Sequence, residues 1–360
     1  MRAASLTFVR SLRGARAPTC MTVDRRTFLR LVASGLASAA LPLMGCAQGP
    51  EQYGLTQLPT PDFPMTPNES WYFVGAQGVY EADARRYRVK IGGLVRKALS
   101  LSVAELKERY ERVVQADTLA CVGDRPNGVL MSSSYFAGVR LKDVLDDAGV
   151  DRRATMVLTT GLDGFVALRG LEDLVEDTTM LAFEMGTEPD ALVPLRIEQG
   201  FPLRLLTPGR YGYLQPKWLD ALTFVDDSDT HAVLQRSLDY FDGKLQLSSG
   251  FTNPFDGWLL DAGPQEVTGY AFGDGRPIAR VEVLAEGRWQ AAEIVWNTVD
   301  DELPGFVWCL WRMRWEAPVG VQTLAVRATY SDGQTQFTGR DFPYSGGSIV
   351  SITVDVRRPA

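Results

Sequence analysis

The stretch over residues 269–360 constrains the fold most, because short alternating segments recur there between turn residues. Residues 280–284 and 324–330 alternate between apolar and polar side chains, and a glycine-containing turn follows each of them. Residues 349–356 repeat the alternation. A period of two is typical of strands with one buried face, and turns at this spacing favour antiparallel pairing. We therefore expect an all-β sandwich over 269–360.

The middle of the chain mixes helical and strand patterns. Residues 101–110 and 141–148 read as short helices, the first with Ser102 and Glu105 at capping-box spacing and the second ended by Gly149. The expected strands cover residues 87–91, 115–121, 155–160 and 203–206. This mixture predicts an α+β domain ahead of the sandwich.

The N-terminal region has the pattern of a twin-arginine export signal. The pair Arg25 and Arg26 precedes a weakly apolar run over residues 31–44, which ends at Cys46 in the sequence Leu-Met-Gly-Cys. The run is too short and too rich in small residues to favour an ordinary transmembrane helix. Its end resembles a bacterial lipobox, with a plain signal peptide and a chance cysteine as the alternative. Acylation of Cys46 would hold the mature protein at a membrane surface.

Charge and cysteine content argue against several other classes of protein, namely those that bind nucleic acid, zinc or covalent haem. The formal net charge is -7, whereas nucleic-acid binding needs a basic face. The cysteines are Cys20, Cys46, Cys121 and Cys309; they form no C-x-x-C pair, and His231 is the single histidine. The pattern therefore argues against a zinc site built from His and Cys, and against covalent c-type haem.

Cys121 lies where an extended segment passes into a polar, glycine-containing loop, close to Arg125. A thiol at a strand end and beside a cation is a candidate thiolate. A small buried core residue is the commoner fate of a cysteine outside disulfides, so composition alone favours that second interpretation.

Several blocks of sequence resemble, in order and spacing, the sulfite oxidase family of molybdenum enzymes. The blocks are residues 118–124, 136–145, 181–185, 199–205, 208–213 and 217–219. The resemblance covers about residues 66–226, and several blocks in order are strong evidence where a single one is not. It implies a sulfite-oxidase-like α+β molybdopterin-binding domain. The C-terminal region resembles the immunoglobulin-like dimerisation domain of the same family, which implies a homodimer.

The resemblance also implies a molybdenum–molybdopterin (Mo-MPT) cofactor and a set of site residues. Cys121 matches the thiolate ligand of the metal, and Tyr240 resembles a tyrosine near the metal that assists catalysis. Arg204 and Lys217 match the positions that bind the phosphate of the pterin, which requires cations. The remaining cofactor-binding positions are Tyr72, Phe73, Val74, Gly75, Ala76, Asp163, Gln199, Gln215 and Pro216.

The chain departs from the family pattern around the expected substrate. Gly75 and Pro126 stand where sulfite-oxidising members have arginines, and Phe136 replaces a tryptophan. Gln199 and Asp124 replace a histidine and an asparagine that are common in the family. We therefore expect a neutral or weakly charged substrate, in a pocket with an apolar wall at Phe136.

These observations divide the chain into five segments. They are a twin-arginine lipoprotein signal at 1–45, with Met21 as the true start; a tether at 46–65; a molybdopterin-binding catalytic domain at 66–230; a connecting segment at 231–268; and an immunoglobulin-like domain at 269–360.

The expected function is oxygen-atom transfer on a small substrate outside the cytoplasm, in the periplasm or cell envelope. Electrons are expected to pass to or from a separate partner such as a c-type cytochrome, since the sequence has no haem or flavin motif. One alternative is a molybdenum-dependent reductase of sulfoxides or similar oxides. A second is a non-catalytic binding protein on the same scaffold, against which the presence of Cys121, Arg204 and Lys217 argues.

Overall fold

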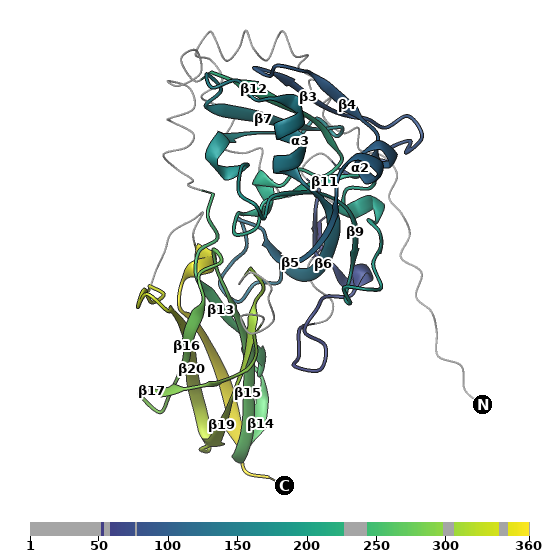
Figure 1. Cartoon of the computed structure of the whole chain (residues 1–360). Coiled ribbons are helices and arrows are strands. Elements are labelled where there is room, and N and C mark those ends of the chain that lie inside the picture. The colour runs from purple at the N-terminus through teal and green to yellow at the C-terminus, as the bar shows by residue number, and fades with distance from the viewer. Residues whose placement is uncertain are drawn as a thin grey trace, which may run out of the picture.

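The computed structural model describes residues 52–53, 58–75, 78–226, 243–297, 306–337 and 345–359. The signal at 1–45 and half of the tether, residues 46–51 and 54–57, lie outside the described residues. Figure 1 shows two bodies: an upper one, formed by the chain up to residue 226 and here called the N-terminal body, and a lower one of strands, here called the sandwich. No described helix is both long and apolar enough to cross a membrane.

The first sheet of the N-terminal body carries the strand that leads to Cys121. Its order is β10–β9–β6–β5, and β11 pairs with β9 on the same edge as β10, next to it along the strand; all the pairs are antiparallel. The strands are β5 (Arg112–Ala120), β6 (Met131–Arg140), β9 (Met180–Gly186), β10 (Val193–Pro194) and β11 (Arg204–Leu206). We call it the β5 sheet.

The second sheet of the N-terminal body has the order β4–β3–β12–β7–β8, and β12 runs parallel to β3 but antiparallel to β7. Its strands are β3 (Val89–Gly93), β4 (Leu99–Leu101), β7 (Met156–Gly161), β8 (Val166–Gly170) and β12 (Leu219–Val225). A separate short pair joins β1 (Gln52–Tyr53) to β2 (Phe73–Val74).

Both predicted helices are confirmed, and local sequence explains their ends. In α2 (Val103–Arg109) the amide of Glu105 donates to Ser102 Oγ at 3.2 Å, and the amide of Ser102 donates to Glu105 Oε2 at 2.8 Å, which is a complete capping box. α3 (Leu141–Ala148) ends at Gly149, whose φ of 64° is left-handed and suits glycine.

Short 3₁₀ helices make up the rest of the described helical structure. They are η2 (Asn68–Ser70), η3 (Leu171–Asp173), η4 (Ile197–Gln199), η5 (Gly212–Leu214) and η8 (Ser345–Gly347). The α+β expectation therefore overstates the helix, because the described part of the N-terminal body is mostly strands.

One apolar core holds the two sheets and both helices together. It joins Val139 and Phe183 of the β5 sheet to Ile91 and Leu222 of the second sheet, and it includes Leu106 of α2. Each of these side chains is at most 3% exposed. Burial of this kind is worth roughly 1.5–3 kcal/mol for each large apolar side chain. The core thus fixes the strand ends that carry the polar residues described below.

The sandwich consists of two sheets that share a second core, as the C-terminal pattern predicts. One sheet has the order β13–β15–β19–β18 and the other β14–β21–β20–β16–β17. The strands are β13 (Ser248–Asn253), β14 (Leu259–Asp261), β15 (Gly263–Phe272), β16 (Ile278–Ala285), β17 (Arg288–Ala291), β18 (Glu293–Trp296), β19 (Cys309–Ala317), β20 (Gly320–Tyr330) and β21 (Val350–Arg357). Trp311, Trp315 and Cys309 are buried in this core and pack against both sheets.

The sandwich begins earlier in the chain than residue 269, where we expected the C-terminal domain to start. β13 and β14 precede that residue, yet β13 pairs with β15 and β14 pairs with β21. Part of the segment predicted as a connection at 231–268 is therefore sheet. Residues 231–242 of that segment lie outside the described residues.

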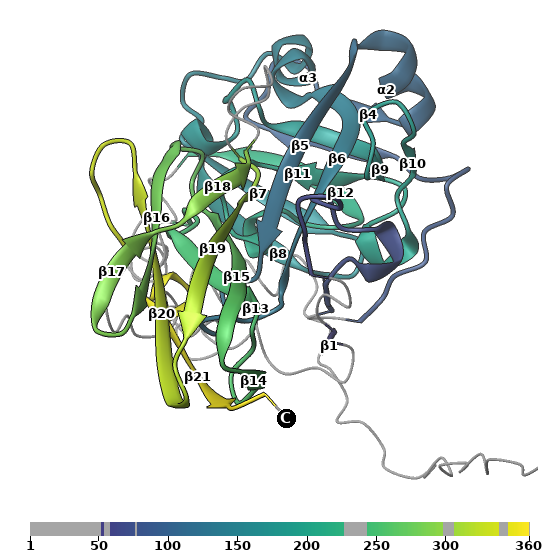
Figure 2. The same ribbon diagram turned by 90° about the horizontal axis from the view of Figure 1, so that it is seen from below.

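The sandwich packs directly on the β5 sheet. In Figure 2, β5 lies beside β15 and β19, and a shared cluster includes Ala116 and Ala120 of β5 with Tyr270 of β15. Two hydrogen bonds complete the edge of β5: the amide of Thr118 donates to Phe306 O at 2.9 Å, and the amide of Trp308 donates to Thr118 Oγ1 at 2.9 Å. Both faces of β5 are thus covered.

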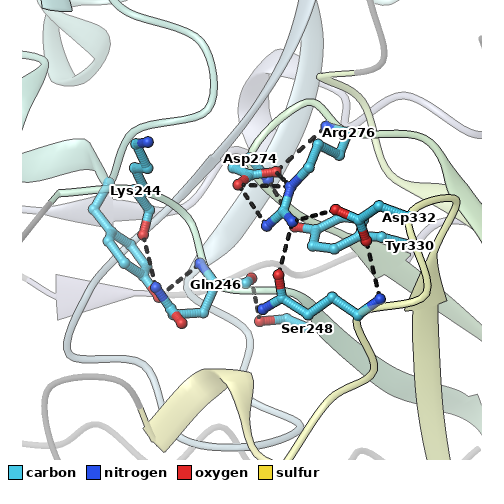
Figure 3. Close-up of polar contacts among 9 residues, drawn as sticks. Lys244, Gln246, Ser248, Asp274, Arg276, Tyr330 and Asp332 are labelled. Atoms are coloured by element: carbon cyan, nitrogen blue, oxygen red, sulfur yellow. Dashed lines mark hydrogen bonds and ion pairs between the residues drawn. The ribbon is translucent and has the colours of Figure 1, made fainter.

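A second contact between the two bodies lies at the loop before β16, and Figure 3 shows the side-chain network that supports this loop. Arg276 donates from Nε to Asp274 Oδ1 at 2.9 Å and from Nη1 to Asp332 at 2.8 Å, and it lies 4.0 Å from the ring of Tyr330. This network fixes the Asp274 carbonyl, which would be only 2.7 Å from a Cβ on Gly209. Gly209, with φ of 75°, therefore allows the N-terminal body to approach the sandwich closely.

Candidate active site

Residues from six separate segments line one cavity in the N-terminal body. The cavity is partly open to solvent and has an empty volume of about 700 Å³, its mouth included. The lining residues are Trp71, Tyr72, Val74, Cys121, Val122, Asp163, Phe165, Gln199, Arg204, Gly212, Tyr213, Gln215, Pro216 and Lys217. They come from the segment around β2, the end of β5, the β7–β8 turn, the end of η4, the start of β11, and η5 with the residues that follow it.

The end of β5 places Cys121 at this cavity. The strand stops at Ala120, and the amide of Cys121 donates to Leu130 O at 2.9 Å across the turn to β6. Asp124 holds the turn: its Oδ2 accepts from the amide of Leu130 at 2.8 Å and its Oδ1 from the amide of Arg125 at 3.0 Å. The thiol of Cys121, 9% exposed, therefore belongs to a turn with a fixed shape.

Asp124 gives this turn a predicted pH dependence. Burial, opposed by hydrogen bonds from backbone amides, raises its pKa to about 6. The folded-state pKa thus exceeds the unfolded value of 3.8, so the stabilisation is fully present below that value and is lost as the pH rises through 6. The variant Asp124→Asn cannot ionise. Relative to the parent, its free energy of unfolding should rise by about 1–3 kcal/mol between pH 4 and pH 8.

Thermal melting of the cofactor-free proteins across this pH range measures the effect. Asp151→Asn is the control, because Arg153 lowers the pKa of Asp151 to about 2 and the pH trend there should have the opposite sign. A difference between Asp124→Asn and the parent that does not change with pH would contradict the assignment.

Two cations, Arg204 and Lys217, face the cavity without a hydrogen-bonded carboxylate among the described residues. Arg204 is 3% exposed and donates from Nη1 to Gln199 O at 3.3 Å. Lys217 donates from Nζ to Glu198 O at 3.0 Å, and its ammonium lies 3.9 Å from the ring of Phe73. Burial lowers the pKa of Arg204 to about 10, and burial and then repulsion from Arg204 hold the pKa of Lys217 well below its usual range.

This arrangement favours an anionic ligand. Two partly desolvated cations beside one cavity repel each other, and a buried charge without a partner is costly. A phosphate oxygen between them would relieve both costs through charge-assisted hydrogen bonds. The cavity therefore fits a ligand that carries a phosphate at the Arg204–Lys217 end and contacts a thiol at the Cys121 end.

The other polar residues of the cavity mainly shape its walls. Gln215 accepts at Oε1 from the amide of Thr207 at 2.9 Å and donates from Nε2 to Arg210 O at 2.7 Å, which closes the loop between them. Asp163 accepts from the amide of Phe165 at 3.1 Å, and burial raises its pKa.

Most of the residues that the sequence singles out for the site are brought together here. Those that line the cavity are Tyr72, Val74, Cys121, Asp163, Gln199, Arg204, Gln215, Pro216 and Lys217. Phe73 is buried beneath Lys217 instead, and Gly75 is not part of the cavity wall. Ala76 and Tyr240 lie outside the described residues. The roles assigned to these residues stay predictions.

The expected apolar wall at Phe136 is wrong. Phe136 is 0% exposed and makes an edge contact with Trp71, with ring centroids 5.5 Å apart. Phe136 pairs with Gln115 across the β5 sheet, and its side chain lies in the buried core on that face of the sheet. Trp71 and Phe165 provide apolar surface at the cavity in its place.

Sequence reasoning missed five lining residues: Trp71, Val122, Phe165, Gly212 and Tyr213. Each lies within three residues of a predicted site position, and Gly212 and Tyr213 belong to one of the matching blocks. Proximity to predicted positions was therefore the available signal.

Comparison with known proteins finds a domain match over most of the N-terminal body. Residues 76–233 match the oxidoreductase molybdopterin binding domain. Mitochondrial sulfite oxidase of Homo sapiens is 28% identical over 313 residues, which cover 73% of this chain and 55% of that protein. NAD(P)H nitrate reductase of Hordeum vulgare is 26% identical over 73% of this chain and 36% of its own length. The chain thus spans about half the length, or less, of these relatives.

A solved structure supports the fold over most of the chain. The sulfane dehydrogenase SoxCD from Paracoccus pantotrophus superposes with a TM-score of 0.68 and covers 86% of this chain and 91% of that chain, at 21% sequence identity.

The matched domain is that of an oxidoreductase that binds molybdopterin. More narrowly, the chain is similar to the sulfite oxidases and nitrate reductases among its relatives, as its sequence blocks predict. The matched domain implies a molybdenum–molybdopterin cofactor, and the cavity has two buried cations and a thiol that suit such a group.

Proposed function

We propose that this protein transfers an oxygen atom to or from a small substrate, at molybdenum held by the thiolate of Cys121. The observation that carries the proposal is that Cys121, Arg204 and Lys217 line one cavity. When bound, the cofactor supplies the redox chemistry. Arg204 and Lys217 would bind its phosphate, Asp163 and Gln199 would contact its polar edges, and Trp71 and Phe165 would limit access of water.

The proposed substrate is neutral or weakly charged. Among the described residues that line the cavity, Arg204 and Lys217 are the cations, and both are assigned to the cofactor. Arg125 is exposed and Arg210 is partly buried, and neither lines the cavity. A Cβ on Gly75 would lie 2.6 Å from the ring of Phe73, so that position has no room for a cationic side chain.

Metal and substrate analysis of protein purified from its export route tests the proposal. We expect one molybdenum and one pterin per chain, and turnover with an artificial electron acceptor or donor. Turnover only in the reducing direction would favour the sulfoxide reductase alternative. A properly folded protein without molybdenum would show that the scaffold has become a binding protein.

We also propose that electrons pass to or from an external redox protein, such as a c-type cytochrome, and that the sandwich is an immunoglobulin-like domain through which the chain forms a homodimer. The shared core of the two sandwich sheets supports the domain assignment. Sedimentation of the holoenzyme would test the homodimer, and a single-chain mass in solution would contradict it.

Export and lipid anchoring are proposed from the signal sequence alone. Mass spectrometry of the mature protein should show a lipidated N-terminal Cys46, and replacing Arg25 and Arg26 with lysine should leave the precursor in the cytoplasm. The substitution Cys46→Ser is the control, because it should block acylation without altering the twin-arginine pair. A mature product that begins at another residue would refute the lipoprotein assignment.

A further inference from the structure

Asp117 is a buried carboxyl beneath the cavity that the proposed function does not yet use. It lies on β5, four residues before Cys121, and is 0% exposed. Neither of its carboxyl oxygens has a hydrogen bond of normal geometry to a described residue, although the nearby amide of Thr118 favours its charged form. A buried carboxyl in this condition is expensive, because the protein replaces few of the hydrogen bonds that water would provide. It therefore calls for a compensating charge nearby.

The strand register identifies Arg204 as that charge. Asp117 pairs with Ser134, and Gln115 pairs with Phe136, so Asp117 and Phe136 lie on the same face of the β5 sheet. The guanidinium of Arg204 lies 6.0 Å above the ring of Phe136, on that face. Its Nε has no hydrogen-bond partner among the described residues either.

The two groups also act on each other electrostatically. Burial raises the pKa of Asp117 well above its usual value, and the charge of Arg204, followed by the backbone amide of Thr118, opposes the rise. Burial lowers the pKa of Arg204 to about 10, and Tyr72 and Asp117 oppose that fall. The pair does not hydrogen-bond directly, so Asp117 leaves the donors of the guanidinium available on the cavity side.

We infer that Asp117 is a positioning residue that compensates the buried charge of Arg204 while the cavity is empty, so that the phosphate site is formed before the cofactor arrives. The inference rests on the proposed role of Arg204 in binding the phosphate. When the phosphate binds, it takes over as the counter-charge, and Asp117 matters less. Its effect should therefore be large in the cofactor-free protein and small in the loaded enzyme.

A double-mutant cycle on the cofactor-free protein tests the coupling itself. Arg204→Met should lower the melting temperature, because it leaves the Asp117 carboxylate buried without a counter-charge. Adding Asp117→Asn should recover about 5 °C of that loss. Ser134→Ala, at the residue paired with Asp117, is the matched control and should be additive with Arg204→Met. Additive losses for Asp117→Asn and Arg204→Met would overturn the inference.

A second measurement tests the role toward the cofactor. Asp117→Asn should melt about 5 °C below the parent when cofactor-free, and within about 1 °C of it when loaded. An equal loss of melting temperature in both states would mean that Asp117 only packs the strand. No loss in either state would mean that its carboxyl is protonated and provides no counter-charge. Either result overturns the inference. If the coupling is found but Arg204→Met binds the cofactor as tightly as the parent, the phosphate assignment fails instead, which separates the two ideas.

Discussion

Replacing Cys121 with serine should abolish turnover and leave the fold intact. The thiol lies at the cavity wall, directly after β5. A thiolate is a soft ligand suited to a redox metal, whereas a serine hydroxyl is a hard and much weaker donor at neutral pH. The change replaces one atom at the edge of a cavity, so the melting temperature of the cofactor-free protein should move little. Steady-state rates and molybdenum content measure the result.

Cys309→Ser provides the matched control. Cys309 is 1% exposed in the core of the sandwich, and burial raises the pKa of its thiol to about 12, so it has no role in ligation. The control should keep its activity while losing roughly 1–3 kcal/mol of stability, because a hydroxyl is buried there. A Cys121→Ser enzyme with full activity and bound molybdenum would falsify the ligand assignment.

The Michaelis constant for sulfite should lie a few orders of magnitude above that of an enzyme with the family's arginines. Sulfite is nearly a dianion at neutral pH, and Gly75 and Pro126 cannot donate a side-chain hydrogen bond to it. Each missing charge-assisted hydrogen bond costs about 1.5–3 kcal/mol, which corresponds to roughly ten- to a hundred-fold in affinity. A neutral substrate does not need this compensation.

Steady-state assays with sulfite, with neutral sulfur compounds and with an artificial acceptor decide this prediction. Gly75→Arg alone should not restore sulfite oxidation, because the ring of Phe73 occupies the space beside that residue. Efficient turnover at micromolar sulfite would defeat the substrate argument and would direct attention to Arg125 or Arg210.

The helix ends and turns could be predicted from sequence because their causes are local. The capping box of α2 involves Ser102 and Glu105, three residues apart, and Gly149 ends α3 by its own backbone conformation. The turn after β16 likewise contains Glu286 and Gly287, both at positive φ. In each case a few neighbouring residues determine the geometry.

The pairing of strands that lie far apart in the sequence could not be predicted in the same way. The strand pattern of β14 is too short to recognise, and its partner β21 lies almost a hundred residues further on, with Leu259 opposite Asp355. The direction of Phe136 depends on a register with β5 that its own neighbours do not reveal. The cavity collects residues from six segments, so only the resemblance to a family could group them before the structure was known.

Because Tyr270, Phe306 and Trp308 lie far along the chain from Cys121, the strand that leads to the active site acquires its full surroundings late in synthesis. The outer edge of β5 is hydrogen-bonded to Phe306 and Trp308, and its second face is covered by Tyr270. A nascent chain that still lacks these residues leaves the strand that carries the ligand half solvated. Cofactor loading should therefore favour chains that include these residues, and a chain truncated before Tyr270 should accumulate without cofactor. Bound metal would then report that the sandwich has folded against the N-terminal body.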